Sequence, residues 1–460
     1  MAVLEPILMV AVAAALASLL LGLNRELFKS AAAKRRVWEE GAAALGLTEP
    51  ELKGIFPRMT LTGHRDGMKI RVEGHGDADG AALLAITVWA HDFVDASLEL
   101  RPESATTALE KLKDGPDLEL GDEEFDASVL VRGEPLLMTA LLGFETRQRI
   151  RHLVTTAGSV RHGRLSMTVV RKLAGSADLA ATANEAIEMA QALQTPADPA
   201  ELLRRNATRD PLSEVRLRNL RLLVEHYRSR TLTTETLRQA LTDQDLEVRL
   251  LAAVTLGDEA RDVLQALAND PGAPDTVNAG AMRALGPAFG VEQTLGALDR
   301  ALNAGRRRVA LAAVEVLGAC ASDAAATELC RLLEGGDGEL AEAAAHALSG
   351  YAEPASEAAL IAALAHEVAA VRVAAAEALT AAGTVAAVAG LRAAQEAHPR
   401  DHELKRAVLV AIAEIQGRAT GAAPGQLSLS AGEAGELALT ADEAGQVSLV
   451  DPQEPTRDET

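Results

Sequence analysis

The chain has 460 residues, enough for two or three domains, and 48% of them are apolar, which suffices for a packed core. Its formal net charge of -21 argues against nucleic acid as a partner, because phosphate groups repel an acidic surface. Only 2% of the residues are aromatic, while alanine, the strongest helix former, is abundant, so the composition favours helices packed on helices. Two cysteines, Cys320 and Cys330, exclude a disulfide framework, and we expect neither a metal nor a cofactor.

The first predicted element is a membrane-spanning helix within residues 1–36. Residues 6–23 carry no charge, and this run is at the lower limit of length for crossing a bilayer. Positive charge follows the run, which places the bulk of the chain in the cytoplasm and the N-terminus outside; the residues are Arg25, Lys29, Lys34, Arg35 and Arg36. A cleaved signal peptide is the alternative, although the positive charge that precedes such peptides is absent.

Residues 37–195 predict an α+β domain, since short alternating strands and helices follow one another irregularly. The expected strands lie at 59–63, 68–74, 83–90, 97–101 and after a turn within 121–133, with a hairpin at 158–171. The expected helices lie at 106–113, 135–154 and 176–194. The stretches LTGHRDGMKIRV (61–72) and GDEEFD (121–126) resemble an uncharacterised domain of bacterial membrane-associated proteins, a resemblance that implies no activity. Prolines then predict a linker over residues 196–211.

Residues 212–416 contain an internal repeat. Six segments share an aliphatic residue, a small or branched residue four positions later and an aliphatic residue eight positions later, starting at Val248, Val277, Val309, Leu340, Val371 and Leu404. This spacing puts the three residues on one helix face, and the middle residue is usually alanine, which allows close helix packing. A second predicted helix precedes each segment, so each unit is a helical hairpin that needs neighbours to bury its apolar face. Glycine follows the segment at 257, 286 and 318 and is predicted to end the helix.

Residues 243–257 and 366–383 look like HEAT repeats of the short bacterial type. In that family an aspartate in the turn and an arginine early in the second helix often form a ladder, and Asp243, Arg249 and Arg372 match these positions. The other repeats depart from the pattern, with Asn278, Ala310, Ala341 and Lys405 in place of the arginine. The resemblance implies an α-solenoid that binds other proteins through an extended concave surface.

One compact basic run interrupts the repeats, at Arg306, Arg307 and Arg308. Two interpretations stand: a contact for an acidic partner segment, or a solvated turn between helices. The last region, residues 417–460, has the acidic composition of a disordered tail. It contains three short strand-like repeats starting at 425, 435 and 445, which either add to the sheet edge of a partner or belong to a low-complexity linker.

The sequence therefore predicts a mainly α protein with an N-terminal transmembrane helix, an α+β middle domain, a C-terminal α-solenoid and a disordered tail. The predicted function is a membrane-tethered adaptor that binds unidentified protein partners and has no catalytic residues. Two alternatives remain. The repeats also resemble those of phycobilin lyase subunits, which implies an enzyme, and the α+β domain could sense a small molecule while the repeats dock a partner.

Overall fold

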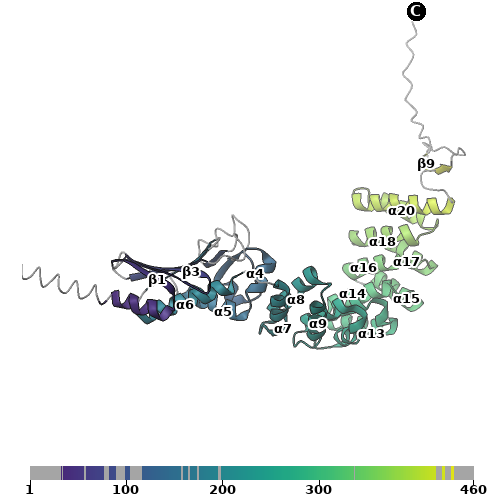
Figure 1. Ribbon diagram of the computed structural model, residues 1–460. Helices are drawn as coiled ribbons and strands as arrows, with labels where there is room; N and C mark the ends of the chain where they lie inside the picture. Colours follow the sequence, from purple (N-terminus) through teal and green to yellow (C-terminus); the bar gives the residue numbers. More distant parts are fainter. Residues whose placement is uncertain are drawn as a thin grey trace, which may run out of the picture. The chain divides into compact units, whose positions relative to one another are not determined.

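The computed structural model is mainly helical and divides into two units, Met1–Leu256 and Gly257–Thr460, which we describe separately (Figure 1). It describes residue 33 and residues 35–55, 58–76, 82–89, 99–103, 117–156, 159–163, 166–172, 176–194, 198–335, 337–420, 427–429 and 437–439. The helices predicted at 6–23 and 106–113 lie outside these ranges. Among the described residues, no helix combines the length and the apolar character needed to cross a membrane.

The first unit is built on a six-stranded antiparallel sheet. Its strands are β1 (Thr48–Ile55), β2 (Arg58–Arg65), β3 (Met68–Gly76), β4 (Ala82–Trp89), β7 (Ser159–Gly163) and β8 (Ser166–Lys172). They lie in the order β1-β2-β3-β4-β8-β7, so the chain leaves this sheet after β4 and returns through the β7–β8 hairpin. In between, β5 (Glu99–Pro102) pairs with β6 (Val129–Arg132) as a separate ribbon. The strands expected from alternating hydrophobicity are thus present, and β1 is an additional edge strand.

The two faces of the large sheet differ because successive side chains point to opposite sides. On β3, Ile70 is fully buried, whereas Lys69 is exposed and Arg71 is half-buried. Helix α6 (Ser176–Ala192) packs against β4 and β8, and the helix over residues 35–45 contributes to the same hydrophobic core. Figure 1 shows both helices beneath the sheet. Within the described part of the chain, Lys69 and Arg71 lie on the opposite face from the core residue Ile70, and we call that face the open one.

The helix predicted over residues 135–154 is two helices, α4 (Pro135–Leu141) and α5 (Phe144–Thr156). The break places Gly143 against Asn206, where a β-carbon on the glycine would lie 2.5 Å from the amide oxygen. The same amide donates hydrogen bonds to carbonyl oxygens in the last turn of α4. Tertiary packing therefore ends α4, and the apolar pattern, which runs on without interruption, does not reveal it.

The predicted linker over residues 196–211 is mostly a helix, α7 (Pro199–Arg209), which forms a hairpin with α8 (Ser213–Tyr227). The prolines that suggested a linker instead bound the helix: Pro199 occupies its first turn, after Asp198 as the N-terminal cap, and Pro211 follows its end. Helices α9 (Thr231–Ala240) and α10 (Leu246–Leu256) complete the first unit. The boundary between the two units, after Leu256, lies inside the solenoid that the sequence predicts over residues 212–416.

The second unit is a stack of helical pairs, as the repeat predicts (Figure 1). The first helices are α11 (Arg261–Asn269), α13 (Val291–Ala304), α15 (Asp323–Gly335), α17 (Pro354–Ala363) and α19 (Ala387–Ala397). The second helices are α12 (Asp275–Leu285), α14 (Arg307–Gly318), α16 (Gly338–Leu348), α18 (Ala369–Ala382) and α20 (His402–Thr420). Short 3-10 turns, η1 (Gly257–Ala260) and η2 (Gly286–Phe289), follow α10 and α12.

The glycines after the repeat pattern act in two ways. Gly257 and Gly286 have positive φ angles of 62° and 51° and follow the ends of α10 and α12, as predicted. Gly318 instead belongs to α14, and a β-carbon there would lie 2.8 Å from the β-carbon of Ala347. Its small size is needed because α14 and α16 approach each other closely.

The tail contains two short strands, β9 (Leu427–Leu429) and β10 (Leu437–Leu439), which pair in antiparallel register. These are the first two of the three predicted strand-like repeats, and the third lies outside the described residues. Two of the repeats therefore pair with each other within a region predicted to be disordered.

Candidate functional site

Ion pairs between successive helical hairpins form the ladder that links the repeats. Arg216 in α8 donates from Nε and Nη2 to the two carboxylate oxygens of Asp243, at 2.8 and 2.7 Å. Asp243 lies in the turn before α10, so the arginine of one hairpin grips the aspartate of the next. Burial raises the pKa of Asp243, but the hydrogen bonds from Arg216 and from the backbone N–H of Asp245 outweigh this effect and lower it overall.

The two predicted ladder residues of residues 243–257 are not directly bonded in this arrangement. Asp243 takes Arg216 as its partner, one hairpin earlier than Arg249. The positive charge of Arg249 makes a smaller contribution to lowering the pKa of Asp243. The Nε atom of Arg249 is buried and has no hydrogen-bond acceptor within the described part of the chain.

Arg372, the third predicted ladder residue, donates to the carbonyl oxygens of His366 and Glu367 at 2.8 and 3.0 Å. It also reaches Asp401 of the next hairpin at 3.3 Å. Asn278, which replaces the arginine in another repeat, bonds the carbonyl oxygen of Leu267 at 2.6 Å. The amide of Asn278 thus caps the turn, and its side-chain oxygen accepts a hydrogen bond from Arg306 of the next hairpin, so a link to the next repeat is kept.

The three arginines of the basic run at 306–308 differ in their contacts: two form ion pairs with neighbouring hairpins, and the third is exposed. Arg306 forms an ion pair with Asp275 of the preceding hairpin at 3.2 Å. Arg307 donates to Asp337 and Glu339 of the following hairpin, with one bond of 2.7 Å to Asp337 and one of 2.6 Å to Glu339. These carboxylates raise the pKa of Arg307, the hydrogen bond with Asp337 contributing most. Arg308 has the exposed side chain of the three, and its backbone N–H donates a hydrogen bond to Asp275.

A buried ion triad joins the α+β part of the first unit to its helical hairpins. Arg147, at the start of α5, donates from Nη1 and Nη2 to Asp210 at 3.0 and 3.1 Å and from Nε to Asp122 at 2.8 Å. Asp122 caps the short helix α3 (Glu123–Asp126), and Asp210 ends α7. The Arg147 side chain has 0% of its surface exposed. Burial lowers its pKa, but the hydrogen bonds with Asp210 and Asp122 outweigh this and raise it.

The Arg147–Asp210 link has the same form as the Arg216–Asp243 link. In both, an arginine early in one helix grips, through two hydrogen bonds, the aspartate that precedes the second helix of the following hairpin. Helix α4 also packs against α7 and α8. The hairpin α4–α5 therefore takes the place of a repeat before α7–α8. One sequence signal was available: Asp210 and Arg216 have the same six-residue separation as Asp243 and Arg249.

The exposed side of the second helices in unit 2 forms a row that we call the inner face. Each second helix contributes one exposed residue, six positions after the start of its repeat pattern: Arg283, Glu315, His346, Glu377 and Val410. Neighbouring second helices pack over more of their length than neighbouring first helices. The more closely packed layer lies on the inside of a solenoid's curve, which is the surface that solenoids use for binding.

Four of the five inner-face side chains are Arg, Glu or His, and the fifth is the apolar Val410. Arg283 and Glu315 neutralise each other through two hydrogen bonds of 2.5 and 2.9 Å. Beyond this pair the row carries His346 and Glu377, with Glu339 exposed nearby on α16. Because packed helices lie about 8–10 Å apart, the five positions extend over roughly 40 Å. This geometry suits an extended peptide segment better than a small molecule.

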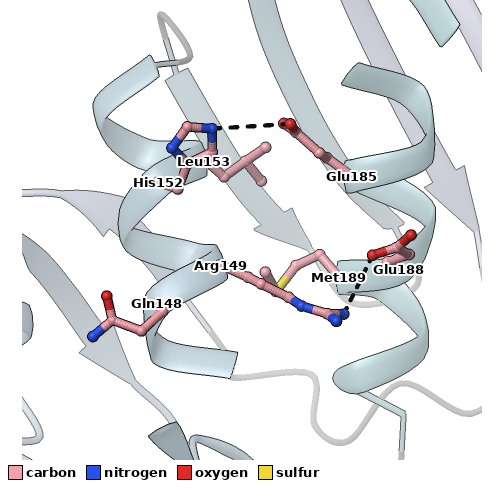
Figure 2. A pocket seen from close by; sticks show the side chains of 7 residues that line it. All are labelled: Gln148, Arg149, His152, Leu153, Glu185, Glu188 and Met189. Atoms are coloured by element: carbon pink, nitrogen blue, oxygen red, sulfur yellow. Dashed lines mark ion pairs between the residues drawn. The ribbon is translucent and has the colours of Figure 1, made fainter. Parts of the chain in front are cut away.

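A separate groove lies between α5 and α6 in the first unit (Figure 2). Its volume is about 300 Å³, and Leu153 and Met189 form its apolar floor. Two ion pairs bridge the helices above this floor, Arg149–Glu188 at 3.3 Å and His152–Glu185 at 3.9 Å; Gln148 completes the lining. The lining includes no serine, threonine or cysteine nucleophile. The groove is at the lower end of the size range of small-molecule sites.

A further groove, of about 340 Å³, lies between α15 and α17 in the helical repeats. Alanines, Cys330, Glu334 and Glu353 are among its lining residues, and none of them is aromatic. Cys320 and Cys330 are free, and burial raises the pKa of both thiols. Within the described residues, no group of metal-binding side chains was found.

Comparisons with known proteins locate similar chains only among solved structures. No protein-family model matches the chain, and no curated protein matches it. Human deoxyhypusine hydroxylase in complex with glycerol shares 19% identity and a TM-score of 0.21, over 47% of this chain and 96% of that one. YibA of Escherichia coli shares 17% identity and a TM-score of 0.31, over 47% of this chain and 92% of that one. At these TM-scores the likeness carries no information about function.

Proposed function

We propose that this protein is a membrane-tethered adaptor that holds an extended segment of a partner protein against the inner face of unit 2. The observation that carries the proposal is the row of one exposed side chain per repeat, from Arg283 to Val410. Ladder pairs such as Arg307–Asp337 and Arg372–Asp401 hold successive repeats in register. A rigid row of this kind can bind a segment without the loss of conformational entropy that the ordering of flexible loops requires.

The tether is proposed from the sequence. The uncharged run over residues 6–23 is followed by five basic residues, a pattern typical of a single-pass helix with its C-terminal side in the cytoplasm. On this proposal the protein resides in the cytoplasmic membrane, and both units lie in the cytoplasm.

The test is affinity capture with the full chain in detergent, comparing three baits. The wild type is compared with Glu315→Arg/Glu377→Arg on the inner face. The matched control is Asp299→Arg/Glu396→Arg, which makes the same charge change at exposed positions on α13 and α19. We expect one protein to be retained at near-stoichiometric level by the wild type and the control, and at least about tenfold less by the inner-face variant.

Equal retention by all three baits would show that the inner face is not the binding surface. If the wild-type bait retains no protein at all, the adaptor proposal fails. Circular dichroism of each bait checks that the charge reversals leave the helices folded.

A second candidate function, binding of a small molecule, rests on the α5–α6 groove. Its apolar floor and paired charges could hold a ligand with an apolar body and a charged end. Thermal-shift screening of the wild type against a metabolite library tests this. A ligand of this groove should raise the melting temperature of the wild type but not that of Leu153→Phe, in which the larger side chain fills the floor.

A further inference from the structure

We propose that the open face of the six-stranded sheet docks on the surface of an anionic lipid bilayer. The open face comprises the alternate positions of the six strands that share register with Lys69 and Arg71. This proposal rests on the proposed membrane tether, which brings the sheet close to a bilayer. The charge and the aromatic residue of the open face belong to the sheet itself.

The register of the sheet gathers positive charge on this face of a strongly acidic chain. Arg71 is paired across the strands with Thr62 and Thr87, and Thr87 with Thr168, which is opposite Arg161. The basic residues at open-face positions are Lys53, Arg58, Lys69, Arg71, Arg161 and Lys172. The strand pairing also places Glu51 and Glu73 on this face, and they form ion pairs with Lys53 at 2.7 Å and with Arg71 at 3.8 Å. With a chain charge of -21, such a local excess is selective for an anionic surface.

Trp89 is the last residue of β4 and is paired across the strands with Lys69, one of these basic residues. Lys69 and Arg71 lie over its ring, with 5.8 Å and 5.4 Å from the cationic group to the ring centroid. The chain has one other tryptophan, Trp38, which is only 1% exposed in the core on the opposite side of the sheet. Tryptophan beside lysine and arginine is the combination that favours the headgroup layer of a membrane.

The shape of the open face favours a lipid surface over an acidic protein segment. The face extends across all six strands, and the grooves described above lie elsewhere. Its central positions carry short hydroxyl side chains, and the hydroxyls of Thr87 and Thr168 are hydrogen-bonded at 3.1 Å. A broad sheet face with hydroxyl and cationic groups matches a plane of phosphate headgroups, whereas a single peptide strand would cover little of it.

The sequence also keeps this face within reach of the proposed anchor. Eleven residues, 24–34, separate the uncharged run from the helix over residues 35–45. Fully extended, they reach at most roughly 40 Å. The sheet therefore stays close to the bilayer in which the anchor is inserted, and binding to the headgroups costs little additional translational freedom.

Trp89 provides a direct test in the full-length protein. Trp38→Phe leaves Trp89 as the single reporter, and the difference between the wild type and Trp89→Phe gives the same signal if the core substitution unfolds the chain. The protein is assembled into nanodiscs of phosphatidylcholine, or of an equal mixture of phosphatidylcholine and phosphatidylglycerol. We expect acrylamide to quench Trp89 about twofold less in the anionic discs, and high salt to remove the difference.

Two charge-reversal variants locate the effect. In Lys69→Glu/Arg71→Glu, acrylamide should quench Trp89 equally in both kinds of disc. Arg205→Glu/Arg221→Glu, which makes the same charge change at exposed positions on α7 and α8, should retain the wild-type difference.

Three results would overturn the proposal. The first is quenching of Trp89 that does not depend on lipid charge, and the second is equal behaviour of the two charge-reversal variants. The third is protection by polyglutamate in neutral discs without protection by anionic lipid, which would assign the face to an acidic protein segment. Failure of the tether is a separate outcome, because a protein without an anchor does not co-elute with discs of neutral phosphatidylcholine.

Discussion

Arg147 and Arg307 make the same kind of link between neighbouring hairpins, in opposite surroundings. Arg147 has 0% of its side chain exposed, and its partners Asp122 and Asp210 have 6% and 1%. Arg307 has 38% exposed, and its partners Asp337 and Glu339 have 53% and 58%. The difference shows that one ladder geometry serves two purposes. In the buried triad, removing one charge leaves the others in a site that water does not reach. Around Arg307, water can solvate a charge that has lost its partner.

The largest effect should follow from removing the arginine of the buried triad. Arg147→Met leaves two carboxylates without their partner in a site closed to water, which costs about 3–5 kcal/mol of folding free energy. Urea denaturation followed by circular dichroism measures the loss.

A triple variant sharpens this test. Asp122→Asn/Arg147→Met/Asp210→Asn removes all three charges, and we expect it to recover much of the stability lost in the single variant. If the single variant is as stable as the wild type, the triad does not hold the α4–α5 and α7–α8 hairpins together.

An intermediate effect is expected at the Arg216–Asp243 pair, of which each side chain is 13% exposed. Arg216→Met removes two charge-assisted hydrogen bonds to Asp243 and two hydrogen bonds to the carbonyl oxygens of Asp210 and Pro211, and it should cost about 1.5–3 kcal/mol near neutral pH. The pKa of Asp243 is lowered in the folded protein from its usual value of 3.8. The pair therefore stabilises the fold above that value, and the contribution is lost as the pH falls through the lowered pKa.

The difference in melting temperature between the wild type and Arg216→Met should accordingly shrink as the pH falls from neutral to about 3. A difference that stays constant over this range would mean that the side chain stabilises through packing and its hydrogen bonds to the carbonyl oxygens of Asp210 and Pro211, and not through the charge of Asp243.

The smallest effect should come from Arg307→Ala. Exposed ion pairs contribute about 0.2–1 kcal/mol, and salt screens them. We expect a loss within this range, which added sodium chloride reduces in chemical denaturation. A loss as large as that of Arg147→Met would contradict the distinction between buried and exposed rungs.

The repeats were predictable because apolar residues and alanines recur at fixed spacing, and that spacing alone determines which helix faces meet. The residue at which the repeats begin was not predictable, because Pro199 and Pro211 are equally typical of a linker and of the residues that flank a helix. The ladder partners were only partly predictable. Asp243 and Arg249 are close in sequence, but Asp243 bonds Arg216, and the choice between the two arginines is made by helix packing.

The buried triad could not be predicted from local sequence. Arg147 is separated from Asp122 by 25 residues and from Asp210 by 63, with the β7–β8 hairpin and α6 in between. The open face of the sheet has the same limitation, since its charges come from five of the six strands, and the order of the strands follows from the fold. A pattern within one strand shows which residues share a side, and only the register shows which residues are neighbours.

The separation of the triad along the chain also has a consequence for synthesis on the ribosome. The chain emerges from its N-terminal end at about 5–20 residues per second, so Arg147 is made some seconds before Asp210. During that interval the arginine has only Asp122 as a partner, and the site that later excludes water is still hydrated. The triad can close only when α7 and Asp210 have been synthesised. The α4–α5 hairpin therefore has its complete set of ion pairs only when the next hairpin begins to form.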